Sequence, residues 1–243
     1  MKKYKHFITS GCSFSSGVIN NPNNTLEAWQ NQSFAWPHYC FLDMWADDHT
    51  FLNFAQPGNG ITATFTSLIY YLELNKHITP GNTLIGFNLT GLERQDIPAK
   101  VDHPNANSDL ATRDTKKELQ LGWIRRNDLT VSTEQYYTDI MQQGAEEISN
   151  FNKIAAIQGI TYLESRGFDY FFMLMTESIV DSADDYFYKF LYERHQNWVT
   201  FDKHRGMYEF VKEQQLATSD GHPSKEGHWL IASHVLEHLK NYE

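Results

Sequence analysis

Serine and histidine residues near opposite ends of the chain have surroundings suited to nucleophilic catalysis. Ser13 lies in the small-residue loop Gly11-Cys12-Ser13-Phe14, directly after a short apolar run. His222 lies in the polar loop Ser219-Asp220-Gly221-His222-Pro223, ahead of the last helical pattern. A histidine whose tautomer is fixed by a nearby carboxylate can take the proton of a serine hydroxyl. Ser13, His222 and Asp220 are therefore candidates for nucleophile, base and orienting acid.

Two further loops contain groups that could stabilise a developing oxyanion. Gly58 follows a second apolar run, and a glycine there lets the backbone approach a ligand and donate its N–H. Asn88 ends a third apolar run, and its side-chain amide could donate to the same oxygen. With the N–H of Ser13, these groups form a candidate oxyanion hole.

The hydrophobic pattern predicts the elements that must bring these loops together. Short apolar runs alternate with longer helical patterns, which is typical of parallel βα units. We expect strands over 4–9, 50–55, 83–88, 168–175 and 198–201, and helices over 34–45, 61–75, 136–165, 184–195 and 225–239. This order predicts an α/β fold, a three-layer α/β/α sandwich with a parallel, flavodoxin-like sheet of about five strands. Ligands of such sheets bind at the carboxyl ends of the strands, where all four loops would lie.

The chain reads as one domain over 1–243. We find no internal repeat, low-complexity tract or linker. The polar, irregular segment at about 91–135 is longer than most loops, and we interpret it as an insertion or lid.

The four loops together resemble the sequence blocks of the SGNH hydrolases, also called GDSL-like esterases. The blocks of that family supply Ser, Gly, Asn and His in this order, and the matching residues here are Ser13, Gly58, Asn88 and His222. The resemblance spans nearly the whole chain, although each block is short. It implies a serine esterase in which Ser13 attacks the ester, His222 acts as base, and Ser13, Gly58 and Asn88 form the oxyanion hole.

The blocks also depart from the family pattern. Cys12 stands where the family has Asp before the nucleophile, Ala55 replaces a Gly of the second block, and Leu89 replaces the Asp that follows Asn. The family Asp lies three residues before the His, whereas Asp220 lies two residues before it. Asp220 completes a triad from a shifted loop, or the site works as a Ser-His dyad.

The sequence looks most like divergent small members of the family from bacteria and their phages. In these, Gly-Cys-Ser-Phe also opens the domain and an Arg follows the third block. Arg94 corresponds to that Arg, which implies contact with an anionic part of the substrate or a structural role.

Other chemistries find weaker support. Gly58-Asn59-Gly60-Ile61-Thr62-Ala63 fits a dinucleotide fingerprint, but it follows the second expected strand and the next strand ends without an acidic residue for a ribose. Cys12 could be a second nucleophile, but the family position of the serine is the next residue. His234 and His238 lie one helical turn apart without a Glu or Cys that would complete a metal site. We therefore expect no metal and no cofactor.

Composition excludes further classes. The formal net charge of −10 argues against a nucleic-acid binder, and no apolar segment reaches the roughly 18 residues of a membrane span. Only two cysteines occur, and the short apolar run near the N-terminus is not a signal sequence. We expect a cytoplasmic protein, bacterial or phage-encoded, that acts on a small-molecule or carbohydrate ester.

The leading functional prediction is hydrolysis of a small acyl ester, such as an O-acetyl group on a carbohydrate. An O-acyltransferase would use the same residues with an alcohol as acceptor. A degenerate carbohydrate-binding or structural module is the alternative from another class, and the altered Asp spacing motivates it.

Overall fold

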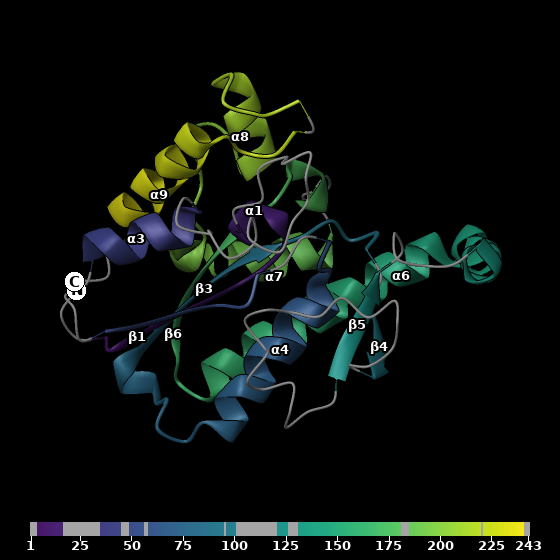
Figure 1. Ribbon diagram of the computed structural model, residues 1–243, viewed down its shortest axis with the longest axis horizontal. Helices are drawn as coiled ribbons and strands as arrows, with labels where there is room; N and C mark the ends of the chain where they lie inside the picture. Colours follow the sequence, from purple (N-terminus) through teal and green to yellow (C-terminus); the bar gives the residue numbers. More distant parts are fainter. Residues whose placement is uncertain are drawn as a thin grey trace.

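A parallel sheet of four strands runs through the middle of the molecule (Figure 1). The computed structural model describes residues 4–16, 35–44, 49–55, 58–94, 96–100, 121–125, 131–180, 185–219 and 221–240. Within these ranges the strands are β1 (His6–Ser10), β2 (Thr50–Asn53), β3 (Thr83–Leu89), β4 (Asp96–Lys100), β5 (Leu121–Arg125) and β6 (Asp169–Leu174). The α-helices are α1 (Ser13–Ser16), α3 (Trp36–Met44), α4 (Ile61–Leu74), α6 (Val131–Ser165), α7 (Tyr186–Tyr192), α8 (Met207–Glu213) and α9 (Lys225–Lys240).

The central sheet has the strand order β2-β1-β3-β6, with every neighbouring pair parallel. All seven residues of β3 are buried, which is typical of an inner strand of a parallel sheet. The register pairs Ser10 of β1 with Phe87 of β3, so both strands end at the same edge. In a flavodoxin-like order, this β1/β3 edge is where ligands bind. The predicted α/β fold and flavodoxin-like strand order are therefore confirmed.

Each face of the sheet has its own hydrophobic core. Successive side chains of a strand point to opposite faces, and the sequence neighbours Phe7 and Ile8 accordingly belong to different cores. Ile8 packs with residues of α4, α6 and α7, whereas Phe7 packs with residues of α3, α8 and α9. Figure 1 shows α3 and α9 on one side of the sheet and α4 and α6 on the other. The predicted three layers are present.

The fifth expected strand does not form. Residues 198–201 make an isolated parallel bridge from Trp198 to Phe172, with the N–H of Val199 donating to the Phe172 carbonyl. Phe201 then pairs with His204 across a tight turn in which Asp202 has a φ of 52°. The turn separates this bridge from a second isolated parallel bridge to β6, that of Gly206 with Leu174, so these residues cover the sheet edge without forming a continuous strand.

The segment predicted as an insertion contains a two-stranded antiparallel sheet. β4 and β5 pair from Asp96 with Arg125 to Lys100 with Leu121, and β4 lies beside α4. The residues between these strands, and 126–130, lie outside the described residues, so the lid remains a prediction. Among the residues that the structure places, no helix combines the length and apolar character needed to cross a lipid bilayer.

One testable prediction concerns the close packing of α4 against α6. A Cβ added at Gly159 would clash with the ring of Phe65, whereas a Cβ at Gly81 meets nothing within 4 Å. We expect Gly159→Ala to lower the free energy of unfolding by about 1–3 kcal/mol, although alanine is the better helix former. Gly81→Ala, the control, should stay within about 0.5 kcal/mol of the parent. Chemical denaturation measures both, and equal midpoints for the two variants would contradict this packing.

Candidate active site

Ser13 begins α1, immediately beyond the carboxyl end of β1. The turn between them passes through Gly11, whose φ is +145°, a conformation that other residues rarely adopt. A Cβ on Gly11 would also collide with the side-chain oxygen of Asn88. The small-residue loop seen in the sequence is thus required by both backbone and packing, and it leaves Ser13 4% exposed at the sheet edge.

His222 reaches Ser13 from the loop that precedes α9. Its Nε2 lies 2.7 Å from the Ser13 Oγ, although 209 positions separate the two residues in the sequence. The histidine loop is a tight turn in which the backbone N–H and Oγ1 of Thr218 both donate to the His222 carbonyl, at 2.7 and 3.0 Å. Gly221 has a φ of +84° within this turn. The structure therefore brings the predicted nucleophile and base into hydrogen-bond contact.

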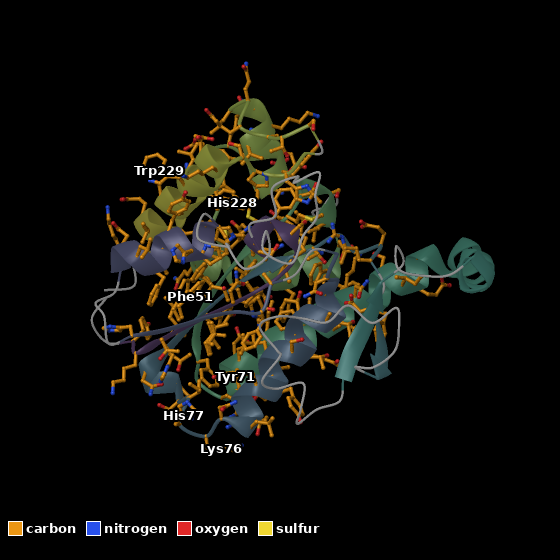
Figure 2. The ribbon with its side chains drawn as sticks, in the orientation of Figure 1. Phe51, Tyr71, Lys76, His77, His228 and Trp229 are labelled. Carbon is orange, nitrogen blue, oxygen red and sulfur yellow. The ribbon has the colours of Figure 1, made fainter. Side chains whose placement is uncertain are left out.

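An aromatic ring contacts the imidazole of His222, and the buried His228 interacts with it electrostatically. Phe14, next to the nucleophile, packs against it with ring centroids 5.4 Å apart. His228 lies on the inner side of α9, and Figure 2 shows Trp229 on the outer side of that helix. Burial, together with the charge of His222, lowers the pKa of His228 to about 3. His228 consequently stays neutral near pH 7 and adds no positive charge beside the base.

Asn88 supports the loop that carries Ser13, residues 11–16, which we call the nucleophile loop. Its Oδ1 accepts from the Cys12 N–H at 3.1 Å and from the Ser15 Oγ at 2.6 Å, and its Nδ2 donates to the Cys12 Sγ at 3.3 Å. The Asn88 side chain is 0% exposed. The amide thus fixes the residue before Ser13 and a residue after it.

Two asparagine side chains connect the loop around Gly58, which we call the second loop, to the nucleophile loop. Asn59 donates from Nδ2 to the Gly11 carbonyl at 3.2 Å, and Asn53 donates from Nδ2 to the Ser15 carbonyl at 2.8 Å. Gly58 is exposed next to Asn59. These bonds place the second sequence block beside the first, as the expected oxyanion hole requires, although they do not themselves test the Gly58 N–H.

Arg94 contacts the second loop directly and the nucleophile loop through Met175. Its Nη1 donates to the Asn59 carbonyl at 3.2 Å, and its Nη2 donates to the Met175 Sδ at 3.4 Å. The same Met175 sulfur lies 3.6 Å from the Cys12 Sγ. The structure therefore places Arg94 at the edge of the site that holds Ser13.

Asp220, the predicted acid, lies outside the described residues, so its role stays a prediction. Sequence analysis missed the supporting residues Ser15, Asn53, Asn59 and Met175. Asn53 is the first residue of the second block and Asn59 directly follows it, so both could have been noticed there. Nothing in the sequence points to Ser15 or Met175, because their contacts depend on the tertiary fold. In the part of the chain that the structure covers, no group of three or more His, Cys, Asp or Glu side chains could hold a metal ion.

Comparison with known proteins finds likeness in structure alone. No family model and no curated protein matches the sequence. Among solved structures, TesA matches with a TM-score of 0.51 at 12% identity, over 97% of this chain and 98% of that chain. The esterase EstA from Pseudoalteromonas sp. matches with a TM-score of 0.49 at 11% identity, over 98% of each chain. A member of the lipolytic protein G-D-S-L family from Veillonella parvula DSM 2008 gives 0.45 at 13% identity, over 96% of each chain. The likeness to TesA shows that this chain shares its α/β fold.

Proposed function

We propose that the protein is an SGNH-type serine esterase that hydrolyses small acyl esters. One observation carries the proposal: the Ser13 Oγ and His222 Nε2 lie 2.7 Å apart at the β1/β3 edge of the sheet. A serine hydroxyl is a weak nucleophile unless a base within hydrogen-bond reach takes its proton. The ordered match of four sequence blocks and the fold shared with TesA support the same class.

The reaction proceeds through an acyl-enzyme. The Ser13 Oγ attacks the ester carbonyl while its proton passes to the His222 Nε2. The tetrahedral intermediate then collapses, and the same proton leaves with the alcohol. Water repeats the sequence on the acyl-Ser13 ester, which releases the acid and restores the hydroxyl. The tilted ring of Phe14 keeps the imidazole turned toward the serine throughout.

Backbone N–H groups at the start of α1 and in the second loop hold the oxyanion. The first N–H groups of a helix have no acceptor within it, and the N–H of Ser13 is one of these. The Gly58 N–H supplies a second donor from the exposed turn. Asn88 fixes Cys12 and Ser15, and the Nδ2 hydrogen that it does not donate to the Cys12 sulfur is the third donor. The proposed substrate is a small acyl ester, for example an O-acetyl group on a carbohydrate.

The first test is chemical modification of the nucleophile. A fluorophosphonate should label Ser13 of the parent, and p-nitrophenyl acetate should be hydrolysed. Ser13→Ala should abolish labelling and lower kcat by about 10⁴-fold or more, with a similar loss for His222→Ala.

Matched controls are available outside the site. Ser233 donates to the Trp229 carbonyl on α9, and His195 is exposed on a distant turn. Ser233→Ala and His195→Gln should keep the parent rate. Labelling that persists in Ser13→Ala would exclude the proposed nucleophile.

A second prediction separates a triad from a dyad. Asp220→Asn removes the charge that would orient and stabilise the His222 imidazolium while keeping the size of the side chain. We expect kcat to fall by on the order of 10²-fold or more if Asp220 completes the triad. Single-turnover acylation of Ser13 measures the effect directly, and an unchanged rate would assign the site as a Ser-His dyad.

A third prediction concerns the buried amide under the loop. Asn88→Ala leaves the buried Cys12 N–H without its acceptor, which should cost about 1–3 kcal/mol of folding free energy. Because the same change frees the loop that carries Ser13, kcat should fall by on the order of 10²-fold. Thermal denaturation and p-nitrophenyl acetate kinetics provide the two readouts. Loss of activity with parent stability would instead indicate a direct oxyanion donor.

A further inference from the structure

The guanidinium of Arg94 is separated from the nucleophile loop by a single sulfur atom. Met175 Sδ contacts Arg94 Nη2 on one side and Cys12 Sγ on the other. Through Asn59, Arg94 is also joined to the Gly11 carbonyl. The cation therefore lies within the same group of contacts as Ser13, on the side of the second loop and β6.

Arg94 has no anionic partner among the residues that the structure describes. Its two contacts are a backbone carbonyl and a thioether, both uncharged. Two other arginines of this acidic chain differ: Arg194 pairs with Glu164 at 2.8 Å, and Arg166 pairs with Glu73 at 3.0 Å. Arg94 is partly buried, and a partly desolvated charge is unfavourable unless an opposite charge compensates it.

The carboxylates nearest to Arg94 in sequence are directed elsewhere. Asp96 accepts from the N–H groups of Gly60 and Ala63 at 2.8 Å each, so it caps the start of α4. Glu93 is exposed, and its carboxylate lies over Gly91. With these two acids turned away, the free N–H groups of Arg94 are left for a ligand.

The backbone that carries Arg94 is held in place from α6. Asn152, only 2% exposed, donates from Nδ2 to the carbonyls of both Leu92 and Arg94 at 2.7 Å. The Arg94 N–H in turn donates to the Gly91 carbonyl at 3.2 Å. A cation whose main chain is fixed before binding loses less conformational freedom when a ligand arrives.

We infer that the ester taken by this site carries an anionic group, which Arg94 binds. The inference rests on the proposed function, because it names the substrate class of the Ser13 site. A guanidinium presents paired N–H donors that match the two oxygens of a carboxylate, or those of a phosphate or sulfate. The negative charge lies a short distance from the scissile carbonyl, in the acyl chain or in the alcohol.

Isosteric substrate pairs test this inference and separate the two positions of the charge. The 4-nitrophenyl monoester of adipic acid is compared with the 4-nitrophenyl ester of adipamic acid, so that the charge lies on the acyl side. 4-Acetoxybenzoate is compared with 4-acetoxybenzamide, so that the charge lies on the alcohol side. In each pair the preference is the ratio of kcat/KM for the anionic ester to that for the neutral ester, after subtraction of the Ser13→Ala rate.

We expect the parent to prefer the anionic member of one pair by about tenfold or more. Arg94→Gln should remove that preference, and Arg94→Lys should retain part of it. Arg166→Gln removes the same charge at the amino end of β6, away from the site, and should keep the parent ratio within about twofold.

Equal kcat/KM for both members of both pairs in the parent would overturn the inference, whether or not an Arg94 variant folds. An unchanged ratio in a folded Arg94→Gln protein would also overturn it and would leave Arg94 a structural role. Neither result touches the proposed function, which fails only if no ester is hydrolysed in a Ser13-dependent way.

Discussion

The candidate site depends on one buried side-chain amide. Asn88 belongs to β3, and its Oδ1 accepts from Cys12 and Ser15, the residues on either side of the Ser13-Phe14 pair. Since β1 and β3 are paired neighbours that end together, the amide can join them without a long side chain. The sheet register therefore determines the position of the nucleophile, because a shift of β3 by one residue would turn Asn88 to the other face.

The same amide accounts for features that lie farther away. Gly11 must lack a Cβ because the Asn88 oxygen occupies that space. Ser15, held by Asn88, also accepts from the Trp36 Nε1 at 3.0 Å, which anchors the start of α3. α3 packs against α9, and α9 follows the loop of His222. The serine and its base are thus connected through one layer of the fold as well as through their own hydrogen bond.

The sequence predicted those parts of this arrangement that local patterns determine. Apolar runs followed by small or polar loops located β1, β2, β3 and β6, and the rule that ligands bind at strand ends then brought Ser13 and His222 together. The strand expected at 198–201 was wrong, because the sharp turn at Asp202 that interrupts the pairing with β6 has no apolar signature. The contacts that hold the site residues in place could not be predicted from the sequence either. An Asn at the end of a strand reads as an amide that faces a ligand, whereas the fold turns its oxygen toward the Cys12 N–H and buries it completely.

The residue before the nucleophile controls how much charge the site holds. The resembling family has an aspartate there, but Cys12 supplies a thiol whose sulfur contacts Asn88 Nδ2 and Met175 Sδ. A carboxylate at position 12 would lie on the other side of the Met175 sulfur from the Arg94 guanidinium and would compensate part of its charge. With a thiol instead, Arg94 contacts no acid among the described residues, which is the basis for the anionic ester inferred above. The replacement of the family aspartate by Cys12 therefore gives a physical reason for the inferred preference for an anionic ester.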